Sequence, residues 1–198
     1  MSTFGLLLIE GKAARWNRAQ LHGYLSMAAV GVMSGILVAY GRTPIHMAGH
    51  KVVFWMAPVL ASRLVTRRSA GASVGALAAA MTTLCAGGRI AGGVTFMPLV
   101  VLAGVVLDVA ARMVEKRRVR WYRALIVLAA AGTIGNLICF VKRVFDPLGT
   151  FFSVGNWRDI LIMAGSHAVF GFMAGFLGAG VGGALVMLGK EKQPPGNV

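Results

Sequence analysis

The sequence predicts an all-α membrane protein, a compact bundle of six transmembrane helices with both termini in the cytoplasm. The first observation is composition: 57% of the residues are hydrophobic and 13% are charged, whereas about a quarter of a soluble domain is charged. The second is that apolar runs of about 20 residues recur, the length that a helix needs to cross a bilayer. The third is that the basic residues lie in short clusters between these runs.

The second of the six spans has the shortest apolar core, and it contains Pro58 and Arg63. It is required because the basic residues before the first span and after the second must lie on one side of the membrane, which takes an even number of crossings. One transmembrane domain at 22–188 therefore follows an amphipathic cytoplasmic segment at 1–21 and precedes a cytoplasmic tail at 189–198. Its expected spans are at residues 22–41, 46–65, 71–88, 95–113, 121–142 and 160–188.

The net charge of +14 does not indicate a nucleic-acid partner, because the basic residues form no single patch. Most of them fall in segments that the six spans place on one side, and cytoplasmic segments are the ones enriched in lysine and arginine. The pattern predicts a multi-pass protein of the cytoplasmic (inner) membrane, in contact with the lipid bilayer. The predicted inner clusters are at residues 12–18, 63–68, 112–123 and 190–192.

Small residues recur on one face of several predicted helices. Gly31 and Gly35 form such a stripe in the first span, and two longer stripes are Gly71, Gly75, Ala79 and Gly171, Gly175, Gly178, Gly182. Small side chains allow the close backbone approach on which helix association in lipid depends. Two interpretations remain open: packing within the bundle, and docking of a partner membrane protein on one stripe.

Most polar side chains within the spans fall in the predicted outer leaflet, which indicates a pocket that opens outward rather than a proton path across the bilayer. The candidate substrate-binding residues are His46, His50, Trp55, Asn136 and His167. The two histidines of the second span are spaced i, i+4, which suits a metal ion, and Met47, Cys85, Cys139 and His167 would be further ligands. The alternatives are interfacial histidines, helix packing by Trp55, and a hydrogen bond from Asn136 to a neighbouring helix.

No pattern predicts an enzyme or an intrinsic cofactor. A Walker motif is absent from the sequence, so uphill transport would take its energy from a partner or an ion gradient. Asp108 lies four residues before Arg112 near the inner end of the fourth span. We expect these two side chains to form an i, i+4 ion pair.

Three segments resemble the substrate-binding S component of an energy-coupling factor (ECF) transporter, a class of ABC transporter. They are Gly49-His50-Lys51-Val52-Val53-Phe54-Trp55-Met56-Ala57-Pro58, Gly135-Asn136-Leu137, and His167-Ala168-Val169-Phe170-Gly171 with Gly175 and Gly178 behind it. The six-span layout with both ends cytoplasmic is similar as well.

The resemblance implies capture of a micronutrient, a vitamin-like small molecule or a metal ion, for uptake energised by a transmembrane T component and ATPase subunits. It implies that the segment 41–49 gates the substrate. It also implies that small residues of the first helix meet the T component; these are Ala28, Gly31, Gly35 and Ala39.

Two other functions remain open. One is a membrane-anchor subunit of a redox complex, with haem held by His50 and His167, since haem between helices needs axial histidines at matching depth. The other is an ion-coupled permease that works alone, in which Asp108 and His167 would be essential. The sequence does not identify the substrate.

Overall fold

The chain folds into six helices, seen here in a computed structural model that describes residues 18–41, 47–87, 96–117, 119–145 and 157–191. Within these ranges there is no strand, which confirms the all-α prediction. Each expected span coincides with one helix, although the ends differ by several residues. The helices are α1 (Arg18–Tyr40), α2 (Val52–Thr66), α3 (Gly71–Cys85), α4 (Met97–Arg117), α5 (Trp121–Phe145) and α6 (Trp157–Glu191).

Four of the helices, α1, α4, α5 and α6, are long and apolar enough to cross a membrane. The other two, α2 and α3, are apolar but have 15 residues each, about 22 Å of helix at about 1.5 Å per residue. That length is shorter than a bilayer core of about 30 Å. Several apolar helices therefore indicate a membrane-spanning protein.

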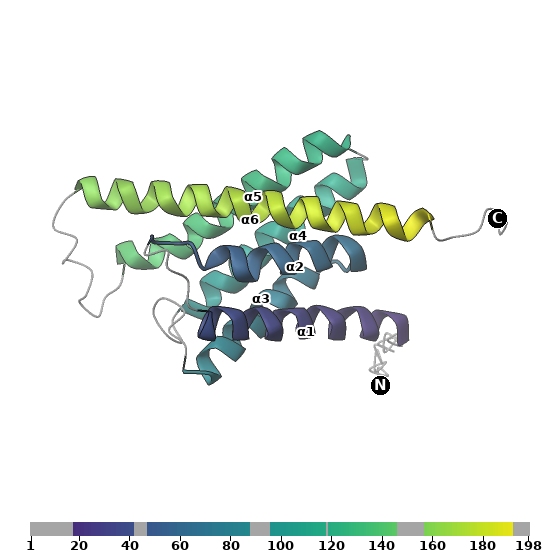
Figure 1. Cartoon of the computed structure of the whole chain (residues 1–198), viewed down its shortest axis with the longest axis horizontal. Coiled ribbons are helices and arrows are strands. Elements are labelled where there is room, and N and C mark those ends of the chain that lie inside the picture. Colours follow the sequence, from purple (N-terminus) through teal and green to yellow (C-terminus); the bar gives the residue numbers. More distant parts are fainter. Residues whose placement is uncertain (1–17, 42–46, 88–95, 118, 146–156, 192–198) are drawn as a thin grey trace, which may run out of the picture.

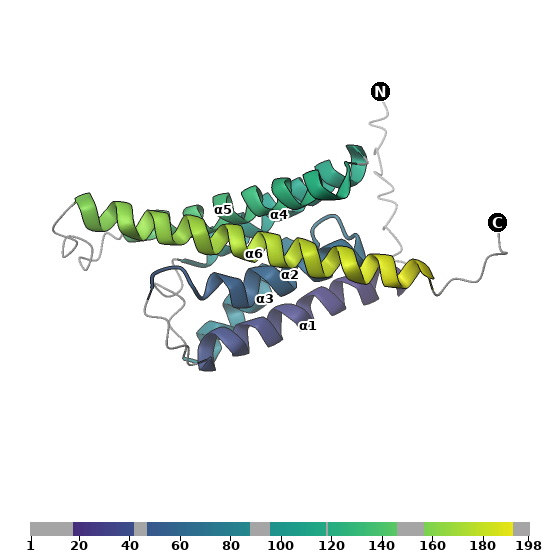
Figure 2. The ribbon, with the colours of Figure 1, turned by 45° about the horizontal axis from the view of Figure 1, so that its top comes forward.

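Successive helices run in opposite directions, so α1 begins and α6 finishes at the same end of the bundle (Figures 1 and 2). Arg63, late in α2, contacts Glu115, late in α4, and Trp121, at the start of α5, lies beside Gly183, late in α6. We call this the basic end, because exposed cations gather there; they are Arg67, Arg112, Lys116, Arg117, Arg120 and Arg123. The opposite end carries His50 and His167 and is called the histidine end.

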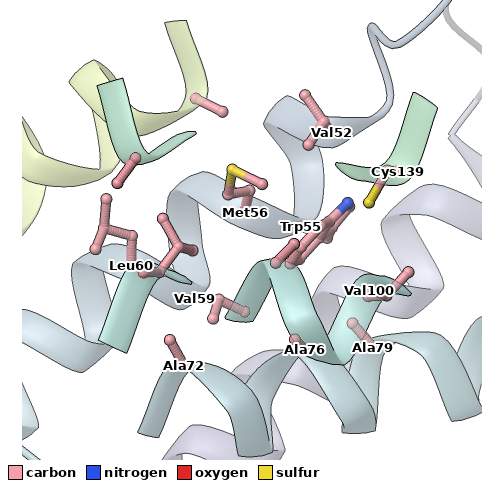
Figure 3. Packing of buried hydrophobic residues seen from close by; sticks show 14 of the residues in the cluster. Val52, Trp55, Met56, Val59, Leu60, Ala72, Ala76, Ala79, Val100 and Cys139 are labelled. Atoms are coloured by element: carbon pink, nitrogen blue, oxygen red, sulfur yellow. The ribbon is translucent and has the colours of Figure 1, made fainter. Parts of the chain in front are cut away.

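The core is built around α2, which packs against α1, α3, α4 and α6. Met56, Val59 and Leu60 of α2 are fully buried, and Val59 points toward the small alanines of α3 (Figure 3). Trp55 is 7% exposed and belongs to the same cluster as Val100 and Cys139 (Figure 3). On α3, Gly75 leaves room for the Val59 side chain, because a Cβ atom there would lie 3.0 Å from it.

The glycine stripe of α6 packs inside the bundle. A Cβ atom on Gly175 would lie 2.8 Å from the Cα of Ala129 in α5, and one on Gly178 would lie 2.7 Å from the carbonyl oxygen of Ala57 in α2. The stripe therefore lies in the groove between α5 and α2, where any larger side chain would separate the helices.

The stripe of α1 also faces inward. A Cβ atom on Gly35 would lie 2.6 Å from the carbonyl oxygen of Ala79, and one on Gly31 would overlap the carbonyl of Gly75, both in α3. Of the four expected docking residues, these two are therefore buried against α3, while Ala28 and Ala39 are half-buried. A partner that docks on α1 would meet its exposed apolar face, which carries Leu25, Val32, Met33, Ile36 and Leu37.

Candidate functional site

The chain turns sharply at residues 48–51 before it enters α2. Gly49 has a φ of +81°, a left-handed conformation that glycine adopts at little cost and that ends helical geometry. The backbone N–H of Val52 donates to the carbonyl of Gly49 over 3.1 Å, which closes the turn. The expectation that the span begins at residue 46 is therefore wrong: His50 lies in a turn and not on a helix, and His46 lies outside the described residues.

This turn is seated on α6. A Cβ atom on Gly49 would lie 2.9 Å from Cγ of His167, so only glycine allows this approach. The Ser166 hydroxyl donates to the carbonyl of Ala48 over 2.6 Å. The His50 ring meets the edge of Phe170 with ring centroids 6.3 Å apart. Three side chains of one helical turn of α6 thus hold the segment that precedes α2.

His167 is buried, at 6% exposure. Its Nδ1 atom lies 2.9 Å from the carbonyl oxygen of Met163, which accepts hydrogen bonds only, so Nδ1 carries a proton. The Phe140 ring of α5 packs on the imidazole with centroids 5.0 Å apart. The ring is therefore fixed in orientation between α5 and the turn.

Asn136 joins α5 to α6. It is 2% exposed, and its Nδ2 atom donates to the carbonyl oxygen of His167 over 2.7 Å. Of the two roles left open by the sequence, this is the hydrogen bond to a neighbouring helix. A buried amide that satisfies a helical carbonyl contributes to the register of the two helices.

The structure brings together His50, Asn136 and His167 but gives Trp55 a place in the apolar core. Across the described ranges, no group of three or more His, Cys, Asp or Glu residues is placed to hold a metal ion. Cys85 is exposed at the end of α3 and Cys139 is buried in α5.

A second polar cluster, which sequence analysis missed, lies at the basic end. Arg63 is completely buried; its Nε donates to Asp108 over 3.0 Å, and its two terminal nitrogens donate to Glu115 over 2.9 and 3.2 Å. Asp108 also accepts hydrogen bonds from the backbone N–H groups of Ala72 and Ser73 and from the Ser73 hydroxyl. The start of α3 therefore helps to balance two carboxylates against one guanidinium, because helix N-termini attract negative charge.

The expected ion pair between Asp108 and Arg112 is wrong. Arg112 donates to the carbonyl of Ser69 over 3.1 Å, and Asp108 points to α2 and α3 instead. Arg63, which the sequence places in an inner basic cluster, has a charge that is buried and paired. The sequence feature that indicates this polar cluster is an arginine within an apolar helix, because such a charge needs a partner of opposite sign.

No model of a known protein family matches the chain, and no curated protein or solved structure matches it significantly.

Proposed function

We propose that the protein is a membrane-embedded subunit that captures a micronutrient at the histidine end and works with a T component and ATPase subunits. In this proposal all six helices cross the cytoplasmic membrane, and both termini are cytoplasmic. The observation that carries it is the turn at 48–51, which closes over buried polar side chains of α6, beside α5.

The orientation follows from charge. The basic end collects the exposed arginines and lysines of the α2–α3 and α4–α5 connections, and such segments stay on the cytoplasmic side. The histidine end then faces outward, where a scarce nutrient would arrive. The short helices α2 and α3 are compatible with spanning if the bilayer thins locally around the bundle.

The chemistry of the histidine end suits reversible capture. The turn contacts α6 through the Ser166 hydroxyl and through the rings of His167 and Phe170. Non-covalent contacts of this kind can break and re-form as a substrate enters. Beneath it lie an imidazole and an aromatic ring, from His167 and Phe140. Rings of this kind stack on a planar organic molecule, which favours a vitamin-like substrate over a bare ion.

The first test is native mass spectrometry of the full-length protein, extracted gently from its own membrane. Copurification of a T component and ATPases, with a small organic mass on the protein, supports the proposal. A chain that carries haem or redox subunits contradicts it, and so does a chain that transports alone.

Replacing His167 with alanine is expected to remove the small organic mass while the complex with the other subunits stays intact, because the imidazole faces the turn rather than a partner. His22→Ala is the matched control, since His22 is exposed near the start of α1 at the basic end. Equal retention of the small mass by both variants would place the substrate elsewhere.

A second prediction concerns the turn itself. In Gly49→Ala the new methyl group would strain the backbone at positive φ and meet the His167 ring, so the turn should open more often. We expect amide hydrogen exchange at residues 52 and 53 to quicken roughly 5- to 30-fold, from a strain of roughly 1–2 kcal/mol.

The control for this variant is Gly87→Ala, because Gly87 has a φ of +67° and open space around its Cβ position. It carries similar backbone strain without a contact to α6. If both substitutions speed exchange at residues 52 and 53 equally, the seat of Gly49 on His167 does not hold the turn.

A further inference from the structure

The basic end contains a cavity of about 660 Å³ between α2, α4, α5 and α6. The helices α5 and α6 are in contact where Gly132 meets Gly171 and Gly175, and they separate from there toward the basic end (Figures 1 and 2). Small side chains leave the space open: Ala124 of α5 and Ala179 of α6 line it. This cavity is at the opposite end of the bundle from His167, so it is separate from the proposed capture site.

The lining is apolar except at one side. Leu125, Leu128 and Val186 form walls of aliphatic carbon, and the charged residues that reach the cavity are Arg67 and Glu115. Trp121 lies at the rim, 47% exposed, a position typical of tryptophan where a membrane protein meets the headgroup region. The cavity thus has a long apolar part and a charged mouth.

The charge at the mouth is positive. Glu115 shares the guanidinium of Arg63 with Asp108, so part of its negative charge is neutralised within the protein. Arg67 is exposed, and its guanidinium forms no ion pair with any residue in the part of the chain that the structure describes. Further exposed cations at this end are Arg112, Lys116, Arg117, Arg120 and Arg123.

We propose that this cavity binds an anionic phospholipid of the surrounding bilayer, with an acyl chain between α5 and α6 and the phosphate on Arg67. The apolar walls match an acyl chain, and an arginine fork matches phosphate oxygens in pairs. Basic pockets between transmembrane helices on the cytoplasmic side are suited to anionic headgroups. A soluble anion would gain nothing from the apolar part of the cavity, which favours a lipid.

The test is native mass spectrometry of the purified, delipidated full-length protein, titrated with dioleoyl-phosphatidylglycerol or with dioleoyl-phosphatidylcholine. We expect the wild type to retain the anionic lipid in preference to the zwitterionic one. Arg67→Asn should weaken binding of the anionic lipid about fivefold, and asparagine is a suitable replacement because it tolerates the left-handed backbone at this position, φ 53°. Arg117→Asn is the charge control, since Arg117 is exposed and does not line the cavity.

A second pair of variants tests the cavity rather than the charge. Val186→Phe fills it, whereas Val181→Phe adds the same side chain to a position of α6 that is 53% exposed and outside the cavity. We expect loss of the lipid in the first variant alone, with thermal unfolding unchanged in both. Equal retention of the two lipids overturns the proposal. So does a loss confined to Arg67→Asn, or to Val186→Phe, because the lipid would then not bind through both the charge and the cavity.

Discussion

Replacing Asp108 with alanine is expected to destabilise the folded protein by about 3–5 kcal/mol, the cost of removing one partner from a buried ion pair. The side chain of Arg63 is fully buried and would keep its charge with Glu115 alone. The N–H groups of Ala72 and Ser73 would lose their acceptor as well. The measurement is the thermal unfolding midpoint in detergent, with the yield of monodisperse protein beside it.

The double variant Arg63→Leu/Asp108→Leu separates charge from packing. Two apolar side chains leave no unpaired charge in the core, and such replacements are often neutral or stabilising. Glu115 is then released, but its side chain is 32% exposed and can be solvated. We expect the thermal unfolding midpoint of the double variant to be well above that of Asp108→Ala. A double variant that is less stable than either single variant would show that the ion pair itself contributes most of the stability.

The control for this prediction is Arg112→Ala. The sequence places Arg112 one helical turn after Asp108, but its guanidinium reaches the Ser69 carbonyl at the exposed surface. Its loss should cost less than about 1 kcal/mol, as for exposed interactions in general. If Arg112→Ala were as damaging as Asp108→Ala, the i, i+4 pair would be the important one.

These residues show which features of the fold a sequence pattern predicts and which it does not. The helices themselves could be predicted, because apolar runs in lipid must satisfy their backbone hydrogen bonds locally. The partner of Asp108 could not, since local spacing favours Arg112 whereas the true partner, Arg63, depends on how α2 and α4 cross. Pairing across helices is a property of packing, which a single sequence does not display.

The candidate site was predictable to a similar degree. The burial of Asn136 and His167 follows from polar side chains within apolar helices, which must face the interior. The turn over His167 was hidden, because the sequence shows Gly49 but not its positive φ or the α6 surface beneath it. The i, i+4 spacing that indicated a metal pair assumed a helix that the glycine prevents.

Replacing Gly35 with leucine is expected to prevent α1 from packing on α3 and to destabilise the folded protein strongly. A Cβ atom would lie 2.6 Å from the Ala79 carbonyl oxygen and 2.8 Å from the Thr82 Cβ, and leucine adds further carbons beyond it. The Thr83 hydroxyl, which donates to the Gly35 carbonyl over 3.1 Å, would lose that bond as the helices separate. Overpacking of this kind costs about 3 kcal/mol or more.

The matched control is Gly180→Leu, because Gly180 of α6 has nothing within 4 Å of its Cβ position. The thermal unfolding midpoint should fall sharply for Gly35→Leu and little for Gly180→Leu. The double change Gly35→Leu/Ala79→Gly should recover little of that loss, since the clash is with the backbone. The resemblance to S components makes a competing prediction: normal folding with loss of T-component binding. That result would mean that α1 can turn its glycines outward when a partner arrives, so this one substitution distinguishes a packing stripe from a docking stripe.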